Sequence, residues 1–131
     1  MARIFNMKDI RIVTEGKPGA LASVTAPIAN ARVNIGAFCT FERGKDVEFH
    51  FVTADNEKVK QALEKAGFAC TEREVIIVET ANESGILFHT AQELAKAGVD
   101  PEYAYSTAGN MGTTWIVFAT KTVEKAMNAM P

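Results

Sequence analysis

Residues 17–35 read KPGALASVTAPIANARVNI, and this stretch decides how the chain folds. Apolar residues recur through its middle at the three- and four-residue spacing of one helix face, and a Pro-Gly pair stands just before them. The segments on either side, 9–14 and 35–42, alternate between apolar and polar residues as strands do. The stretch therefore predicts a turn out of one strand, a helix, and entry into a second strand.

The patterns that follow, up to residue 73, complete one folding unit. A glycine-containing turn at 43–46 precedes another alternating segment, 47–53. An Asp-Asn pair is placed to cap a second helix and Gly67 to end it, after which 68–73 has the pattern of a last strand. The order β-α-β-β-α-β predicts the ferredoxin-like split βαβ, an antiparallel sheet with both helices on one face.

The chain repeats this design once. Residues 83–104 align with 17–38 at an offset of 66 (85 − 19), which places Gly85 on Gly19 and keeps the leucine two residues later. No residues remain for a last strand of the second unit, so its sheet either ends early or takes a strand from residues 2–5 or from a partner chain. The elements predicted for this half are strands at 74–79, 102–107 and 113–120 and helices at 86–97 and 122–130.

Four features together resemble ACT-domain proteins, in their small stand-alone tandem form. They are Pro-Gly-x-Leu after the first strand, Asn34 thirteen residues after Leu21, the strand order and the duplication. The resemblance is weaker in the second half, where ESG lacks the proline and VDPEY stands in place of VNI. It implies an α+β fold of two ferredoxin-like βαββαβ units, 1–73 and 74–131, side by side in one continuous antiparallel sheet with helices on one face. The second unit would lack its last strand.

The same resemblance implies a non-catalytic regulatory protein that binds an amino acid or a similar small ligand. In that family two units pair first helix to first helix and second strand to second strand. The ligand lies at their interface, between the loop before the first helix of one unit and the Asn before the second strand of its neighbour. The ligand-binding residues implied for this chain are Lys17, Pro18, Gly19, Ala20, Leu21, Asn34 and Ile35 in the first half, and Ser84, Gly85, Ile86 and Asp100 in the second.

Elementary chemistry supports a carboxylate ligand at this loop. The first N–H groups of a helix lack internal partners and carry the positive end of its dipole, and Gly19 leaves room for close approach. Asn34 offers an oxygen to an ammonium group and an NH₂ to a carboxylate. The alternative is that Pro18-Gly19 is only a turn and Asn34 only a cap. Asp100 replaces Asn34 in the second half, so that site either takes a different ligand or has lost binding.

Composition and charge restrict the partners. Hydrophobic residues make up 47% and charged residues 23%, with no membrane-length apolar window. Lys and Arg number 14 against 16 Asp and Glu without long blocks, which argues against nucleic acid. The start of the chain has no signal-peptide pattern, so we expect a soluble, cytoplasmic protein. Cys39 and Cys70 are expected to be free thiols, and His50 and His89 surface or interface residues. No cofactor, metal or catalytic residue is predicted.

The strands of the second half are apolar on both faces, which predicts that the second face is covered. A homodimer packing sheet on sheet would cover it, and so would a small satellite core. We therefore expect a homodimer, an amino-acid ligand and a regulated partner protein. Two other classes remain open: a ligand-free oligomerisation or assembly module of the same fold, and a small ferredoxin-like enzyme.

Overall fold

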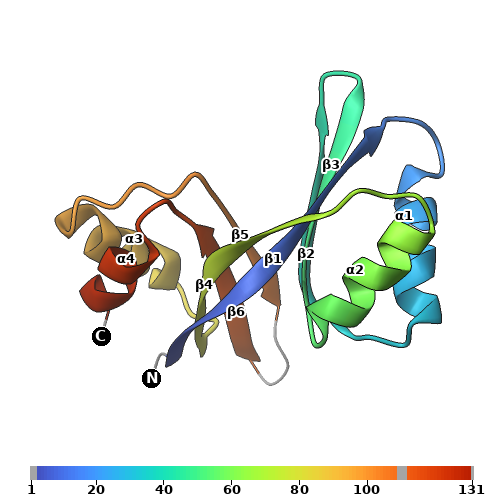
Figure 1. The fold of residues 1–131 in the computed structure, drawn as a ribbon. Helices are drawn as coiled ribbons and strands as arrows, with labels where there is room; N and C mark the ends of the chain where they lie inside the picture. Colours follow the sequence, from blue (N-terminus) through green and yellow to red (C-terminus); the bar gives the residue numbers. More distant parts are fainter. Residues whose placement is uncertain (1–2, 109–111, 131) are drawn as a thin grey trace. The chain divides into compact units, whose positions relative to one another are not determined.

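The computed structural model describes residues 3–108 and 112–130, which form six strands and four helices (Figure 1). Hydrogen-bonded neighbours follow the order β2-β3-β1-β4-β6-β5, and the described pairs of β1 with β3, β2 with β3, β4 with β6 and β5 with β6 are antiparallel. The predicted α+β class and antiparallel sheet are confirmed. The elements are β1 (Arg3–Glu15), α1 (Ala20–Asn30), β2 (Ile35–Arg43), β3 (Asp46–Thr53), α2 (Asn56–Lys65), β4 (Thr71–Ala81), α3 (Ile86–Lys96), β5 (Tyr103–Ala108), β6 (Thr113–Ala119) and α4 (Val123–Ala129).

The chain forms two compact units, and the long strands β1 and β4 contribute to both. One unit, called the N-unit here, is Lys8–Arg73; the other, the C-unit, combines the described residues of Met1–Met7 with Glu74–Pro131. The segments 68–73 and 74–79, expected as separate strands, were predicted wrongly. They meet in the single strand β4, because the sequence TEREVIIVETA contains no glycine or proline that would turn the chain.

The start of β1 supplies the C-unit with the strand that its own half of the sequence lacks. The Arg3 guanidinium lies 3.0 Å from a carboxylate oxygen of Glu79, and the Asn6 amide donates to Glu74 at 2.8 Å. The ring of Phe5 meets Trp115 edge to face, with 5.6 Å between centroids. Both carboxylates belong to β4. Residues 3–7 are therefore part of the C-unit, and the rest of β1 is part of the N-unit.

Each unit has its own apolar core, formed by its strands and its two helices. In Figure 1, α1 lies beside α2 and α3 beside α4, and each pair packs together. The N-unit core contains Ile10, Ile12, Ala20, Val24, Ile28, Phe49, Phe51, Val59 and Leu63. The C-unit core contains Ile76, Val78, Leu94, Val99, Ile116, Phe118, Ala126 and Met130. Among the described helices none is long and apolar enough to cross a membrane.

The opposite face of the C-unit strands is also buried, within a single chain. Val75, Ile77 and Val117, which alternate with the core residues, are all 0% exposed. The predicted coverage of the second face is therefore present in one chain. The case for a homodimer that packs sheet on sheet rested on that face being uncovered, and this reason for it no longer holds.

We predict that Ile4→Ala lowers the free energy of unfolding by about 1–2 kcal/mol, because Ile4 is partly buried against the C-unit core. Phe5→Ala should shift the emission of Trp115, the only tryptophan, by removing its ring contact. Chemical denaturation followed by tryptophan fluorescence measures both effects. Lys8→Ala, an exposed position on the same strand, is the control. Unchanged midpoint and spectrum in Ile4→Ala and Phe5→Ala would contradict the docking of this strand.

Candidate functional site

The two halves of the chain use the same turn to enter their first helix. The Ala20 amide donates to the Lys17 carbonyl at 3.1 Å, and the Ile86 amide to the Glu83 carbonyl at 3.3 Å. Gly19 has φ 89° and ψ −2°, and Gly85 has φ 85° and ψ −3°, which are the angles of the third residue of a type II turn. Only glycine adopts them readily. We call these segments, Lys17–Ala20 and Glu83–Ile86, the first and second glycine turns.

The helices that follow the glycine turns begin without side-chain caps. No described side chain caps α1 or α3, whereas Asp55 caps α2 by accepting from the Lys58 amide at 3.1 Å. In α1 the Ser23 amide bonds to the Gly19 carbonyl at 2.9 Å, which starts the regular helix pattern. The amides of Leu21 and Ala22 lie at the positive end of the helix, where an anionic group is favoured.

The space in front of both turn glycines is open. A Cβ atom built on Gly19 or Gly85 would have no described atom within 4 Å, apart from the adjacent residues. Lys17 and Pro18 line a hollow of about 830 Å³ together with the turn between β2 and β3. Ala20 differs from its neighbours in the loop because its side chain belongs to the N-unit core.

Asn34 and Ile35 lie in another hollow of the N-unit, of about 370 Å³, which we call the α1–β2 groove. Asn34 has an exposed side chain, and its carbonyl accepts from the Ala54 amide at 3.0 Å. The other lining residues are Ala22, Thr25, Ala26, Ile28, Ala29 and Val33. The structure thus does not bring Asn34 and the first glycine turn of the same unit into one pocket.

The second glycine turn borders an apolar hollow of about 550 Å³, the α3 groove. Gly85 and Ile86 line it, while the exposed Ser84 and Asp100 do not. The remaining lining residues are Asn82, Glu83, Leu87, Phe88, Ala91, Ser106, Thr114 and Ile116. The sequence reasoning missed the two most exposed large apolar side chains of the chain's described part, Leu87 at 57% and Phe88 at 67%. The sequence could have revealed this exposure, because two consecutive apolar residues of one helix cannot both face the core.

Large apolar side chains are also exposed along α1 and β2. Leu21 is 47% exposed, Ile35 37% and Phe38 50%. β2 stands at the end of the strand order, so one of its edges has no neighbouring strand among the described residues. Unpaired strand edges and exposed apolar residues are features of surfaces that bind another protein.

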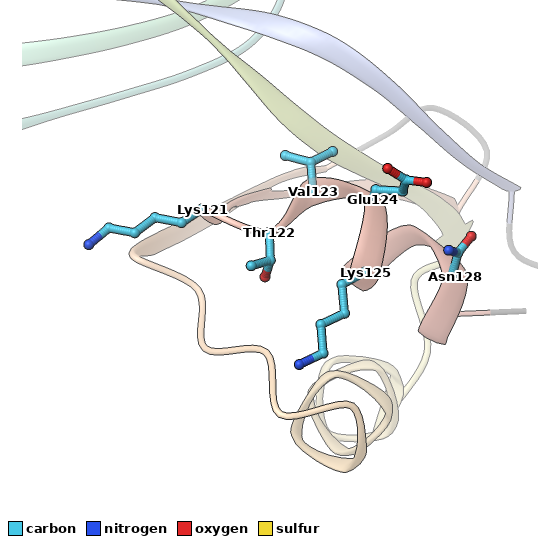
Figure 2. A pocket seen from close by; sticks show the side chains of 6 residues that line it. All are labelled: Lys121, Thr122, Val123, Glu124, Lys125 and Asn128. Carbon is cyan, nitrogen blue, oxygen red and sulfur yellow. The ribbon is translucent and has the colours of Figure 1, made fainter.

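A further hollow lies at the start of α4 (Figure 2), and the position of one of its lysines has a structural explanation. It is lined by Lys121, Thr122, Val123, Glu124, Lys125 and Asn128. Figure 2 shows the side chains of Lys121 and Lys125 extending in different directions rather than converging on one point. The Lys125 ammonium lies beside Gly98, just past the end of α3. The negative end of the helix dipole stabilises a cation at this position.

His50, interpreted above as a surface or interface residue, is buried at 1% exposure, so that interpretation was wrong. Its Nδ1 lies 2.9 Å from Asp9 Oδ1 and its Nε2 2.6 Å from Glu48 Oε2. Arg11 donates to both oxygens of Glu48 at 3.0 Å, and Arg43 donates to one at 3.1 Å. β3 is buried on both faces, so strand alternation could not reveal this. These five residues are the His50 cluster.

The charges of the His50 cluster shift the pKa values of its members. The hydrogen bond from Arg11 lowers the pKa of Glu48 to about 2, against the opposing effect of burial and with help from His50 and Arg43. Burial alone would lower the pKa of His50, but the hydrogen bonds and charges of Asp9 and Glu48 outweigh it and raise the pKa above 6.5. The cluster therefore favours the charged form of His50 more than water does.

Other chemistry considered from the sequence finds little support. Cys39 and Cys70 are free and half-buried, and burial raises the pKa of both thiols. His89 is exposed, as expected. Across residues 3–108 and 112–130, no three His, Cys, Asp or Glu side chains are grouped so that they could hold a metal ion.

No family model matches the chain, and no curated protein matches it. Solved structures do match. Protein BT0572 from Bacteroides thetaiotaomicron is 27% identical, with a TM-score of 0.87 over 96% of this chain and 87% of that one. The regulatory subunit of aspartate kinase from Thermus thermophilus, in its ligand-free form, is 14% identical, with a TM-score of 0.72 over 98% and 93%. The aspartokinase alpha and beta subunits are 16% identical, with a TM-score of 0.63 over 96% and 93%.

These matches identify the class of fold. The chain has the fold of regulatory ACT-domain subunits of aspartate kinase, so the resemblance inferred from the first glycine turn and the repeat is confirmed.

We predict that Glu48→Gln lowers the free energy of unfolding by about 3 kcal/mol at neutral pH. A tenfold change in proton affinity is worth about 1.4 kcal/mol, and the folded pKa of Glu48 falls from 4.5 to about 2. A depressed pKa stabilises the fold above pH 4.5, and this contribution is lost as the pH falls toward about 2. Urea unfolding of both proteins over this range measures the difference.

The difference between wild type and Glu48→Gln should therefore shrink steadily in acid. Glu42→Gln, an exposed glutamate on the neighbouring strand, is the matched control and should change stability little at any pH. A constant difference between wild type and Glu48→Gln across the acid range would contradict the assigned ionisation of Glu48.

Proposed function

We propose that this chain is a non-catalytic regulatory protein that binds an amino acid, or a similar small carboxylate, where two ACT-like units meet. The observation that carries the proposal is the repeated glycine turn. It precedes a helix that has no side-chain cap, and the space beside the turn glycine is open. A helix start of this kind suits a carboxylate, because unpaired N–H groups and the helix dipole both favour negative charge. Asn34 adds an oxygen that can accept from the ligand's ammonium group.

Completion of this site by a neighbouring unit is part of the proposal. The first glycine turn and Asn34 line different hollows of the N-unit, so a small ligand that touches both needs a second copy of one of them. The exposed Leu21, Ile35 and Phe38 support pairing through α1 and β2, since an interface would bury them. The N-unit of one chain against the N-unit of another gives a homodimer with two such sites.

The second half of the chain carries a related site of different character. Its glycine turn opens α3 in the same way, with Ser84 in place of Pro18. The residue that replaces Asn34 is Asp100, which repels a carboxylate, and the adjacent α3 groove is apolar. We infer that the first glycine turn binds the amino acid and that the second either takes a more apolar ligand or serves packing.

The regulatory action follows from linkage. A ligand that tightens the interface between units changes the affinity for another protein only if that protein prefers one of the two states. Two structural neighbours are regulatory subunits of aspartate kinase. By analogy, the proposed partner of this chain is an enzyme whose activity it regulates.

Assembly without a ligand is the second candidate, because the exposed Leu21, Phe38, Leu87 and Phe88 also suit a purely structural interface. The two functions differ in one respect. A ligand raises the stability of a binding protein in proportion to its concentration, and an assembly module has no such response.

We predict that at least one of the twenty amino acids raises the melting temperature in a thermal-shift screen. A ligand at ~100 times its Kd adds ~2.7 kcal/mol to the free energy of unfolding. Gly19→Val and Asn34→Ala should abolish the response, because the first blocks the turn and the second removes the amide. An absence of any shift with wild type would contradict amino-acid binding and favour the assembly module.

Two control variants separate binding from folding in this experiment. Gly67→Val places a side chain at φ +94°, with open space around it, and so carries backbone strain similar to that at Gly19, with φ +89°. Asn30→Ala removes an exposed amide at the end of α1. Both controls should keep the ligand response, and its loss in either would mean that the site variants report stability rather than contact.

We predict that the chain forms a homodimer through α1 and β2. Light scattering should give about twice the chain mass of 14.2 kDa at micromolar concentration. Phe38→Lys combined with Leu21→Lys should yield the single-chain mass, because charges would replace exposed apolar residues at the interface. Phe88→Lys, which removes an even more exposed apolar residue from α3, is the control. Dissociation by Phe88→Lys alone would place the interface on α3 instead.

A further inference from the structure

The His50 cluster holds the imidazole in a state that requires both of its protons. Nδ1 faces Asp9 Oδ1 at 2.9 Å and Nε2 faces Glu48 Oε2 at 2.6 Å, in a position where His50 is 1% exposed. The charged ring donates to both carboxylates. A neutral ring has one N–H, so its other nitrogen would present a lone pair to a carboxylate oxygen. One of the two contacts must open when His50 loses a proton.

The contact to Glu48 is the one that opens. Asp9 is 0% exposed, so water cannot replace its contact with the ring. Glu48 has strong alternatives, because Arg11 donates to both of its oxygens at 3.0 Å and Arg43 to one at 3.1 Å. Deprotonation therefore moves the Glu48 carboxylate away from the ring and toward the arginines.

Arg43 connects this movement to the first glycine turn. Arg43 ends β2, and Lys45, two residues later, accepts a hydrogen bond from the Gly16 amide at 2.9 Å. The approach is so close that a Cβ on Gly16 would lie 2.8 Å from the Lys45 oxygen, so the two segments are in direct backbone contact. Gly16 directly precedes the turn, and Lys45 lines the same hollow as Lys17.

We propose that His50 is a proton switch for the first glycine turn: loss of its proton releases Glu48 toward Arg43, shifts the β2–β3 turn and, through the Lys45–Gly16 hydrogen bond, alters the geometry that receives the ligand. Its effect on ligand affinity rests on the function proposed above. The switch itself needs no ligand.

Titratable and charged groups from three strands surround His50. The groups that face it are Asp9 and Arg11 from β1, Cys39, Phe41 and Arg43 from β2, and Glu48 from β3. The pKa of Glu48 is about 2, and burial with the charges of Asp9 and Glu48 raises that of the Cys39 thiol above 9.0. Both carboxylates raise the pKa of His50 above 6.5, so the switch operates on the alkaline side of this value.

An NMR titration of the chain without ligand tests the switch. The amide signals of Gly16, Gly19 and Lys45 should move between about pH 6 and pH 9 with the midpoint of the His50 ring signals. His89→Gln removes the only other histidine, which is exposed on α3, and should leave this behaviour unchanged. A His50 ring that does not titrate in this range, or one that titrates without moving these amides, would overturn the proposal.

Arg43→Gln tests the path without disturbing the buried contacts. Its side chain is 63% exposed, and the contacts of His50 to Asp9 and Glu48 do not involve it. In this variant the His50 ring should still titrate, while the amides of Gly16 and Gly19 should no longer follow it. Amides that follow the ring as in wild type would show that the path through Arg43 is wrong.

Affinity measurements link the switch to function. For the amino acid found in the thermal-shift screen, the Kd of wild type should differ at least about threefold between pH 6 and pH 9, and that of Arg43→Gln should stay constant. An equal pH dependence in both would overturn the coupling. A screen without a hit would contradict the proposed function but not the switch, which the titration without ligand decides separately.

Discussion

A glycine with positive φ at the entrance of each unit's first helix is the constraint on which the structure depends. Gly19 and Gly85 reverse the chain within four residues, so that strand and helix pack against each other without a longer loop. The same geometry takes the place of a side-chain cap and leaves the helix start open. The packing of strand against helix therefore requires this glycine whether or not a ligand is bound.

The elements predicted from local pattern were largely correct, because helix and strand periods are set by near neighbours in sequence. The features that sequence could not supply depend on distant contacts. The sequence left open whether residues 2–5 or a partner chain completes the sheet of the C-unit. Strand alternation in β3 could not show that His50 is buried between two carboxylates. The resemblance implied the first glycine turn and Asn34 as site residues, and this stays a prediction. The sequence could not show that they line different hollows of the N-unit.

The first glycine turn and the His50 cluster, both in the N-unit, differ in the groups that they present. The glycine turn offers backbone donors and open space, which suit reversible binding of a small anion. The cluster instead concentrates hydrogen-bonded polar side chains in a buried position. Lys45 bonds to Gly16, next to the glycine turn, and follows Arg43 of the cluster by two residues, so the two features lie close together along the chain.

The passage of β1 and β4 through both units has a consequence for how the protein folds. A break after Arg73 would divide β4 and separate Arg3–Met7 from the strand it accompanies, leaving each fragment without part of its sheet. Neither half is therefore an autonomous domain, despite the duplicated design. Unfolding should be a single cooperative transition, in which loss of order in one repeat is transmitted to the other along continuous backbone.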